Sequence, residues 1–408
     1  MKDLARAAAI PLILVWLGAT ATWSLRVARA DYLARQETLR ATHAALRWAP
    51  TQAAYHVRLA VLAEQSDPAL ALSEWRRAIE LDPQDPRAYI DLGLKLERDG
   101  QLQEAEQDLL SAAAVDHEYL PKWTLANFYF RRQNAAQFWP WAKAAAEMMY
   151  GEGTPLFRLC GEWAEDGNLI ERLRIERPEV RAHYLSYLLD YGGPDVASIL
   201  LPATRAVLDQ DRKEDLPLLM RACDRLIEGR QFEAAIDVWN RLAESRRIPL
   251  GGVGPQTGSV INGTFSAAPT LHGFDWRMPA CAGVSLSMEN RSPGLRLTFS
   301  GEQRDCTFLL QYVPLRDKTN YQLTIAYRTA GIPADSGLVW RVTDLQTSQL
   351  LAEEPVPSSE SRQSLTISFR TPANCGIVNL SLQYRHIPDQ LRIRGILELR
   401  SVISQPQR

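Results

Sequence analysis

The sequence predicts two architectures in series, an α-helical solenoid followed by an antiparallel β-sandwich. Residues from about 31 to 250 are rich in Ala, Leu, Glu and Arg and show a 3.6-residue apolar period, which is typical of packed helices. Further along, apolar and polar residues alternate between turn residues. An uncharged run near the N-terminus predicts a transmembrane helix. The expected fold class is therefore multidomain, α then β, with an N-terminal transmembrane helix.

Length and composition agree with this division. The chain has 408 residues, of which 46% are hydrophobic and 23% are charged, so it can build two or three cores. The formal net charge is -2, so no overall basic field would attract nucleic acid, and we expect no nucleic-acid partner. No C-x-x-C motif occurs, which leaves zinc-knuckle and thioredoxin-type sites without support.

The N-terminal segment carries a targeting signal. Two basic residues precede an uncharged run over residues 7–25, and Arg26 ends it. A helix over this run extends roughly 28 Å at about 1.5 Å per residue, close to the ~30 Å hydrocarbon core of a bilayer. A small-x-small sequence at 28–30 leaves a cleaved signal peptide as the alternative, but the long run favours an uncleaved signal anchor over residues 1–30. We therefore expect a membrane-anchored protein whose bulk is exported, either periplasmic or at the cell surface.

The helical region repeats with a period of 34 residues. Ala71, Trp75 and Ala78 are followed one period later by an equivalent set, which consists of Ala105, Leu109 and Ala112. The spacing resembles the tetratricopeptide repeat, a pair of antiparallel helices of the same period. Small residues let the two helices approach closely, and the larger side chain fills the gap. The stretch LDPQDPRAY (81–89) ends one helix and caps the next.

Fainter matches extend the pattern beyond the first two units. They occur at Trp123, Ala126 and Phe130, and again at Ala235, Trp239 and Leu242. Because at least three stacked units are needed to bury a continuous core, we expect an α-solenoid of irregular helix pairs over residues 31–250, with a generic helical bundle as the alternative. Solenoids present a concave surface, so we expect a protein partner there. The motif residues themselves belong to the core.

Alternating segments follow a glycine-rich stretch, GGVGP (251–255), which we expect to act as a linker over residues 251–257. No Lys-Ser/Thr follows it, so it is not a phosphate-binding loop. About eight strands in about 150 residues, each with one apolar face, predict an antiparallel sandwich over residues 258–408. The residues expected to face its core are Leu295, Leu297, Phe299, Tyr321, Leu323, Ile325, Tyr327, Leu338, Trp340, Val342, Leu365, Ile367, Phe369, Val378, Leu380, Leu382 and Tyr384.

Short motifs in this region occur in a fixed order. They run NGTF (262–265), GFDW (273–276), GLRLTFSG, LLQYVPL, NYQLTIAYRT, GLVWRVTD, SLTISFRTP and GILELRSVIS. Their order and spacing resemble the jelly-roll carbohydrate-binding modules of families 4 and 9, which implies a jelly-roll fold and a glycan ligand. Those families often hold a structural calcium through acidic residues. Here Thr264, Ser266 and Arg400 occupy the corresponding positions, so we expect no calcium and no other cofactor.

Sugar recognition requires an aromatic ring against the C–H face of the sugar and planar polar side chains for its hydroxyl groups. Trp276 lies outside the strand alternation, where it could line the edge of a site. The candidate glycan-binding residues are therefore Trp276, Gln311, Arg328, Arg341, Gln383 and Arg385, the last five being placed on the face opposite the core. The alternative is that these polar residues only solvate an outer face while Trp276 plugs one end of the sandwich.

Catalytic motifs are weak, so we expect no enzyme. The six histidines are scattered, and neither G-x-S-x-G nor H-E-x-x-H occurs. A glycoside hydrolase stays an alternative, because two carboxylates distant in sequence leave no local signature. One disulfide can form among Cys281, Cys306 and Cys375, but sequence alone does not pair them.

Together these features predict a non-enzymatic, membrane-anchored scaffold. Its solenoid would bind a protein partner and its sandwich a polysaccharide or other glycan. Such a protein would serve in the assembly or export of a surface polysaccharide. A purely structural protein–protein adaptor is the first alternative.

Overall fold

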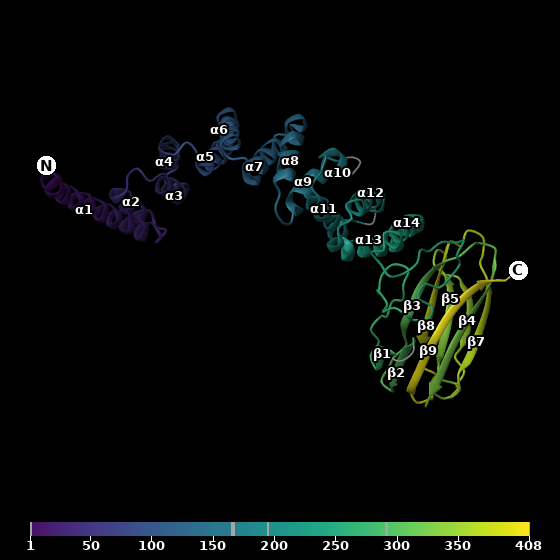
Figure 1. The fold of residues 1–408 in the computed structure, drawn as a ribbon. Coiled ribbons are helices and arrows are strands. Elements are labelled where there is room, and N and C mark those ends of the chain that lie inside the picture. Colours follow the sequence, from purple (N-terminus) through teal and green to yellow (C-terminus); the bar gives the residue numbers. More distant parts are fainter. Residues whose placement is uncertain (1, 165–167, 194–195, 290–292, 408) are drawn as a thin grey trace. The chain divides into compact units, whose positions relative to one another are not determined.

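The computed structural model describes residues 2–164, 168–193, 196–289 and 293–407, with their side chains from residue 14 onward. The chain divides into two compact units. The first extends to about residue 164 and includes Glu171–Ile175, and the second consists mainly of Glu176–Arg408. Helical repeats followed by a β-sandwich are present as predicted (Figure 1).

The first unit is built from helix hairpins. Its helices are α1 (Lys2–Ala34), α2 (Leu39–Trp48), α3 (Ala53–Ala63), α4 (Pro68–Leu81), α5 (Pro86–Arg98), α6 (Leu102–Val115), α7 (Tyr119–Arg131), α8 (Ala135–Met148) and α9 (Thr154–Gly161), and the short α10 (Leu169–Arg172) follows. The pairs α3–α4, α5–α6 and α7–α8 each pack against one another. Their first helices begin at Ala53, Pro86 and Tyr119, 33 residues apart, which is one residue shorter than the predicted period of 34.

Local chemistry explains why these helices start and pack where they do. The carboxylates of Asp67 and Asp85 accept hydrogen bonds from the backbone N–H groups at the starts of α4 and α5, where a proline occupies the first turn. A Cβ on Gly93 would lie 2.8 Å from Leu109, so the missing side chain lets α5 approach α6. The motif residues of both units, Ala71, Trp75, Ala78, Ala105, Leu109 and Ala112, are all buried as predicted.

The predicted transmembrane helix is wrong. Helix α1 covers the predicted span, yet none of the described helices is both long enough and apolar enough to cross a bilayer. The first part of the span, residues 7–13, lies outside the residues with described side chains. The lack of a spanning helix among the described residues overturns the predicted signal anchor, the membrane partner and the membrane-anchored localisation that depended on it.

The second unit combines four helices with the β-sandwich. Its helices are α11 (Pro178–Tyr191), α12 (Ala197–Leu208), α13 (Leu216–Glu228) and α14 (Phe232–Glu244), with a 3₁₀ turn, η2 (Lys213–Asp215), before α13. In the pair α13–α14, the predicted motif residues Ala235, Trp239 and Leu242 are fully buried. This pair therefore repeats the packing of the helix hairpins in the first unit.

Two antiparallel sheets form the sandwich. The strands are β1 (Val284–Met288), β2 (Leu295–Ser300), β3 (Cys306–Pro314), β4 (Asn320–Ala330), β5 (Leu338–Asp344), β6 (Leu350–Pro355), β7 (Gln363–Arg370), β8 (Ile377–Tyr384) and β9 (Arg394–Pro406). The five-stranded sheet has the order β1-β2-β9-β4-β7, and the four-stranded sheet the order β3-β8-β5-β6. The predicted inward residues meet in one core between the sheets, with Leu365 at its margin. A disulfide joins Cys281 to Cys306, while Cys375 is free and buried.

Helices α13 and α14 hold the segments that lead into the sandwich. The Asn240 amide donates to the Val253 carbonyl at 2.9 Å and accepts from the Val253 N–H at 2.6 Å, which ties the glycine-rich stretch to α14. The Asp224 carboxylate of α13 accepts hydrogen bonds from Gly273 and contacts His272. Gly273 has a φ of +57°, and a Cβ there would lie 2.4 Å from the Trp239 ring. Glycine is therefore required where the HGFDW loop meets α14. The predicted domain limits at residues 30, 250 and 257 stay predictions.

Candidate functional site

Trp276, the predicted aromatic platform, is an interior residue. Its side chain is fully buried, and its ring stacks on Phe265 with 5.3 Å between the ring centroids. The indole N–H donates to the Asn262 carbonyl at 3.1 Å. Trp276 therefore closes the core instead of facing a ligand.

Gln311 is also buried, because strand β3 does not alternate regularly. A register shift between Thr307 and Leu309 reverses the alternation, so Phe308 and Leu309 are both buried and Gln311 follows on the inner side. Its amide donates to the Ile261 carbonyl at 2.8 Å. This contact ties the opening segment of the sandwich to β3.

The other four predicted residues are divided between two faces. Arg341 and Gln383 lie on β5 and β8, and Arg385 directly follows β8, so these three belong to the four-stranded sheet. Arg328 lies on β4 of the five-stranded sheet. The predicted residues therefore do not form a single surface.

The outer face of the four-stranded sheet is polar and partly paired. Arg341 contacts the carboxylate of Glu353 at 2.8 Å, and Arg385 contacts the same carboxylate at 3.4 Å. Gln383 donates to the hydroxyl of Ser381 at 3.0 Å. The side-chain oxygen of Asn379 is buried and has no hydrogen-bond partner within the described part of the chain. The two guanidinium groups and the Gln383 amide therefore offer planar polar groups to a hydroxyl-rich ligand, whereas the Asn379 oxygen is closed to solvent.

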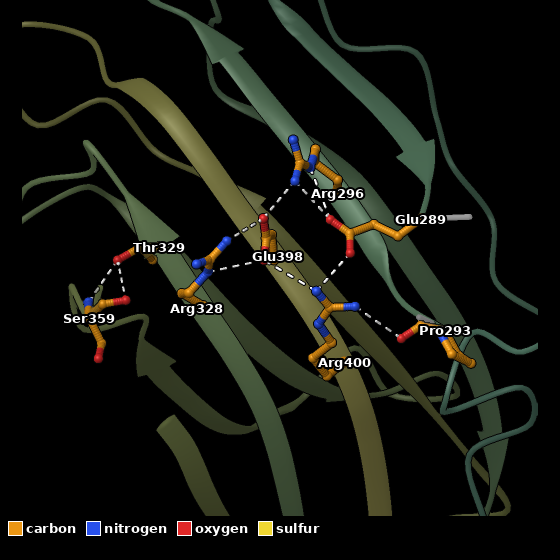
Figure 2. A network of polar contacts seen from close by, with 8 residues as sticks. All are labelled: Glu289, Pro293, Arg296, Arg328, Thr329, Ser359, Glu398 and Arg400. Carbon is orange, nitrogen blue, oxygen red and sulfur yellow. Dashed lines mark hydrogen bonds and ion pairs between the residues drawn. The ribbon is translucent and has the colours of Figure 1, made fainter. Parts of the chain in front are cut away.

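The outer face of the five-stranded sheet carries a denser network (Figure 2). The strand register places Arg296 of β2, Glu398 of β9 and Arg328 of β4 in one row across the sheet. Arg328 donates to both oxygens of Glu398, at 3.1 Å from Nε and 2.8 Å from Nη2. Arg296 Nη2 donates at 2.9 Å to Oε1 of Glu398, the oxygen that also accepts from Arg328 Nη2.

A second carboxylate completes this network. Glu289 accepts from Arg296 Nε at 3.0 Å and contacts Arg400 Nη2 at 2.7 Å. Arg400 also reaches Glu398 at 3.4 Å and the Pro293 carbonyl at 3.4 Å. We call Arg296, Arg328, Arg400, Glu289 and Glu398 the arginine cluster.

The contact between Arg328 and Glu398 shifts the pKa of both groups. Hydrogen bonds from Arg328 are the main reason that the pKa of Glu398 lies below its ordinary value. The same contact raises the pKa of Arg328. The cluster therefore carries three positive and two negative charges at neutral pH.

Nearly all aromatic rings of the sandwich belong to its core. Among the described residues from 258 onward, Tyr312 is the one aromatic side chain that is not buried. The Arg277 guanidinium lies 4.8 Å from the centroid of the Tyr312 ring. The described part of the sandwich therefore lacks an open aromatic platform for a sugar ring.

The helical unit contains a recess of about 390 Å³ where α3 faces the start of α5. Its lining combines aliphatic and charged side chains, namely Glu37, Ala54, Val57, Arg58, Val61, Leu62, Asp85 and Arg87. Further along α5, burial and the nearby Glu64 carboxylate raise the pKa of Asp91 to about 6. This surface is amphipathic, as expected of one that binds a peptide.

No metal centre is evident in the described residues, where no group of three or more His, Cys, Asp and Glu side chains is positioned to hold an ion. Sequence reasoning missed most of the arginine cluster. The only signal was the alternation of charged and apolar residues in LRLTFS and in GILELRS, which places Arg296, Glu398 and Arg400 on outward positions. Nothing in either segment indicates that the two strands are neighbours.

Comparison with known protein families supports the resemblance to the tetratricopeptide repeat. The tetratricopeptide repeat family model matches residues 74–107. No curated protein matches the chain. A fold alone does not decide whether a chain is an enzyme.

Solved structures resemble each part of the chain. A family 4 carbohydrate-binding module is 15% identical with a TM-score of 0.29, covering 36% of this chain and 99% of the module. YrrB, described as a tetratricopeptide repeat protein with an unusual peptide-binding site, is 16% identical with a TM-score of 0.26, covering 51% and 94%. Pseudomonas aeruginosa pilF is 19% identical with a TM-score of 0.27, covering 56% and 93%. These scores are low, and the fold follows from the helix pairs and strand order described above.

Proposed function

We propose that this protein is a binding scaffold with two modules. The helical repeats bind a segment of a protein partner, and the β-sandwich binds a glycan on the outer face of its four-stranded sheet. The observation that carries the glycan proposal is the polar set on that face. Arg341, Gln383 and Arg385 supply planar polar groups on this face, two of them guanidinium groups and one an amide.

The recess between α3 and α5 supports the protein-binding part of the proposal. Val61 is half exposed beside Arg58 and Arg87, so an apolar side chain and a carboxylate of one peptide could be held together. A scaffold with both modules suits a factor that brings a polysaccharide to the proteins that assemble it. That role rests only on the pairing of the two modules.

Calorimetric titration of the full chain with neutral oligosaccharides and polysaccharides tests the glycan proposal. We expect saturable binding to one of them, weakened about tenfold by Arg341→Gln because a charge-assisted hydrogen bond is lost. Arg328→Gln removes the same charge from the opposite sheet and is the matched control, which should bind as the unchanged protein does. Binding that is insensitive to Arg341→Gln, or no binding from a folded protein, overturns the proposal for this face.

A protein–protein adaptor is the second candidate. The absence of an open aromatic ring on the described part of the sandwich favours it, because most sugar sites use such a ring. In that case the panel of neutral glycans gives no binding, and the sandwich faces are expected to contact protein.

A further inference from the structure

The arginine cluster orders its charges by depth. The side chains of Glu398 and Glu289 are 5% and 16% exposed, whereas those of Arg296 and Arg328 are 42% and 44% exposed. Figure 2 shows the guanidinium groups of Arg296 and Arg328 converging on Glu398 from the two strands that flank β9. A molecule that approaches this face therefore meets guanidinium groups before carboxylates.

Two positive charges in the cluster are held close together. The Nη2 atoms of Arg296 and Arg328 both lie within 2.9 Å of one oxygen, Oε1 of Glu398. Among the described residues, Glu398 is the only carboxylate that pairs with both Arg296 and Arg328. Their mutual repulsion would be relieved by a further anion at the surface. The Nη1 atoms of both residues have no hydrogen-bond partner among the described residues, so each can still donate.

Guanidinium groups select a particular kind of anion. Their paired N–H groups match the two oxygens of a carboxylate or the edge of a sulfate, and the fit is both planar and charge-assisted. Glu398 orients the Arg328 group through two bonds, so little side-chain freedom is left to lose when an anion binds. The geometry therefore suits an oxyanion presented at the surface of the sheet.

The surroundings of the cluster suit a glycan better than a protein as the carrier of that oxyanion. The outward residues of neighbouring strands are mostly small and polar, including Ser287 of β1, Thr324 of β4 and Thr366 of β7. Protein interfaces are centred on apolar and aromatic anchors. On the described strands of this sheet, Ile403 is the only large apolar side chain that is well exposed.

From these observations we infer that the arginine cluster binds the carboxylate or sulfate groups of an acidic glycan, at a site separate from the face proposed for neutral glycans. The choice of a glycan as the carrier rests on the proposed function of the sandwich. The oxyanion is held between Arg296 and Arg328, in front of Glu398. Arg400 pairs with Glu289 and keeps that carboxylate in place beneath the two exposed arginines.

Titration of the full chain with polygalacturonate, dextran sulfate and neutral dextran tests this site. We expect saturable, salt-sensitive binding to polygalacturonate, to dextran sulfate or to both, and none to dextran. Which acidic polymer binds decides between carboxylate and sulfate. Arg328→Gln and Arg296→Gln should each weaken binding about tenfold, because each removes a charge-assisted contact.

Matched variants separate this site from general attraction to a polyanion. Arg370→Gln removes one positive charge from the outer side of β7, away from the cluster, and should leave binding unchanged. Arg328→Lys keeps the charge but not the two-pronged geometry and should restore only part of the affinity. Thermal unfolding confirms that each variant is folded.

Three results would overturn the inference: no binding to either acidic polymer, equal losses in Arg370→Gln and Arg328→Gln, or binding unaffected by both cluster variants. The neutral-glycan titration with Arg341→Gln is independent of all three. Failure of this site can therefore be distinguished from failure of the proposed function.

Discussion

The two outer faces of the β-sandwich use the same residue types, but only the five-stranded sheet layers its arginines above a buried carboxylate. On the four-stranded sheet, Glu353 is about as exposed as the arginines that contact it. On the five-stranded sheet, Glu398 lies beneath Arg296 and Arg328. Composition is therefore a poor guide to ligand charge, because the order of depth decides which group a ligand meets first. A carboxylate at the surface repels an anion, whereas a buried one only orients the arginines above it.

The largest expected effect is on stability, and it tests whether Trp276 belongs to the core or to a binding surface. Trp276→Ala should lower the free energy of unfolding by about 3–5 kcal/mol, because it removes a fully buried ring that stacks on Phe265. Denaturant unfolding followed by circular dichroism measures the change. A stable variant that loses glycan affinity would instead place Trp276 at a binding surface.

The disulfide links the segment before β1 of one sheet to the start of β3 of the other. Replacing Cys281 and Cys306 together by serine should destabilise the protein by about 3 kcal/mol, since the bond closes a loop of 25 residues. Unfolding of the unchanged protein with and without a reductant gives the same comparison without mutation. An unfolding curve that does not shift in either experiment would mean that this crosslink contributes nothing to stability.

The smallest expected effect is the difference in stability between substitutions of Glu398 and of Glu353. Glu398→Gln should cost about 2 kcal/mol, because three arginines lose a mostly buried, ionised partner. Glu353→Gln should cost less than about 1 kcal/mol, because its ion pairs are open to solvent. Equal costs in denaturant unfolding would contradict the difference in depth between the two faces.

The Glu398→Gln variant should also change the pH dependence of stability. The folded pKa of Glu398 lies below its ordinary value of 4.5, so its stabilising contribution is present above about pH 4.5 and is lost as the pH falls through the folded pKa. Glu398→Gln should therefore flatten the acid side of the stability profile, whereas a profile as steep as that of the unchanged protein would contradict this role of Glu398. Melting temperatures measured between about pH 3 and 7 provide the test.

The sequence predicted those features that depend on local spacing. Ala71, Trp75 and Ala78 report the packing of one hairpin directly, because a helix places residues three and four apart on one face. Gln311 was misplaced because the register shift in β3 reverses the alternation. The pair Arg296–Glu398 could not be found, since its members are 102 residues apart and meet only through the strand order β2-β9-β4. The transmembrane prediction counted uncharged residues, and none of the described helices is both long enough and apolar enough to cross a bilayer.

The glycine at position 273 limits where the sandwich could be joined to another protein. Trp239 of α14 fits against the backbone of Gly273, and its ring meets Phe274 edge to face. If a sandwich from another protein were joined at the glycine-rich stretch, its loop would not be shaped to fit Trp239. Grafting the sandwich into another protein should therefore begin upstream of α13, so that the contact between Trp239 and Gly273 is kept.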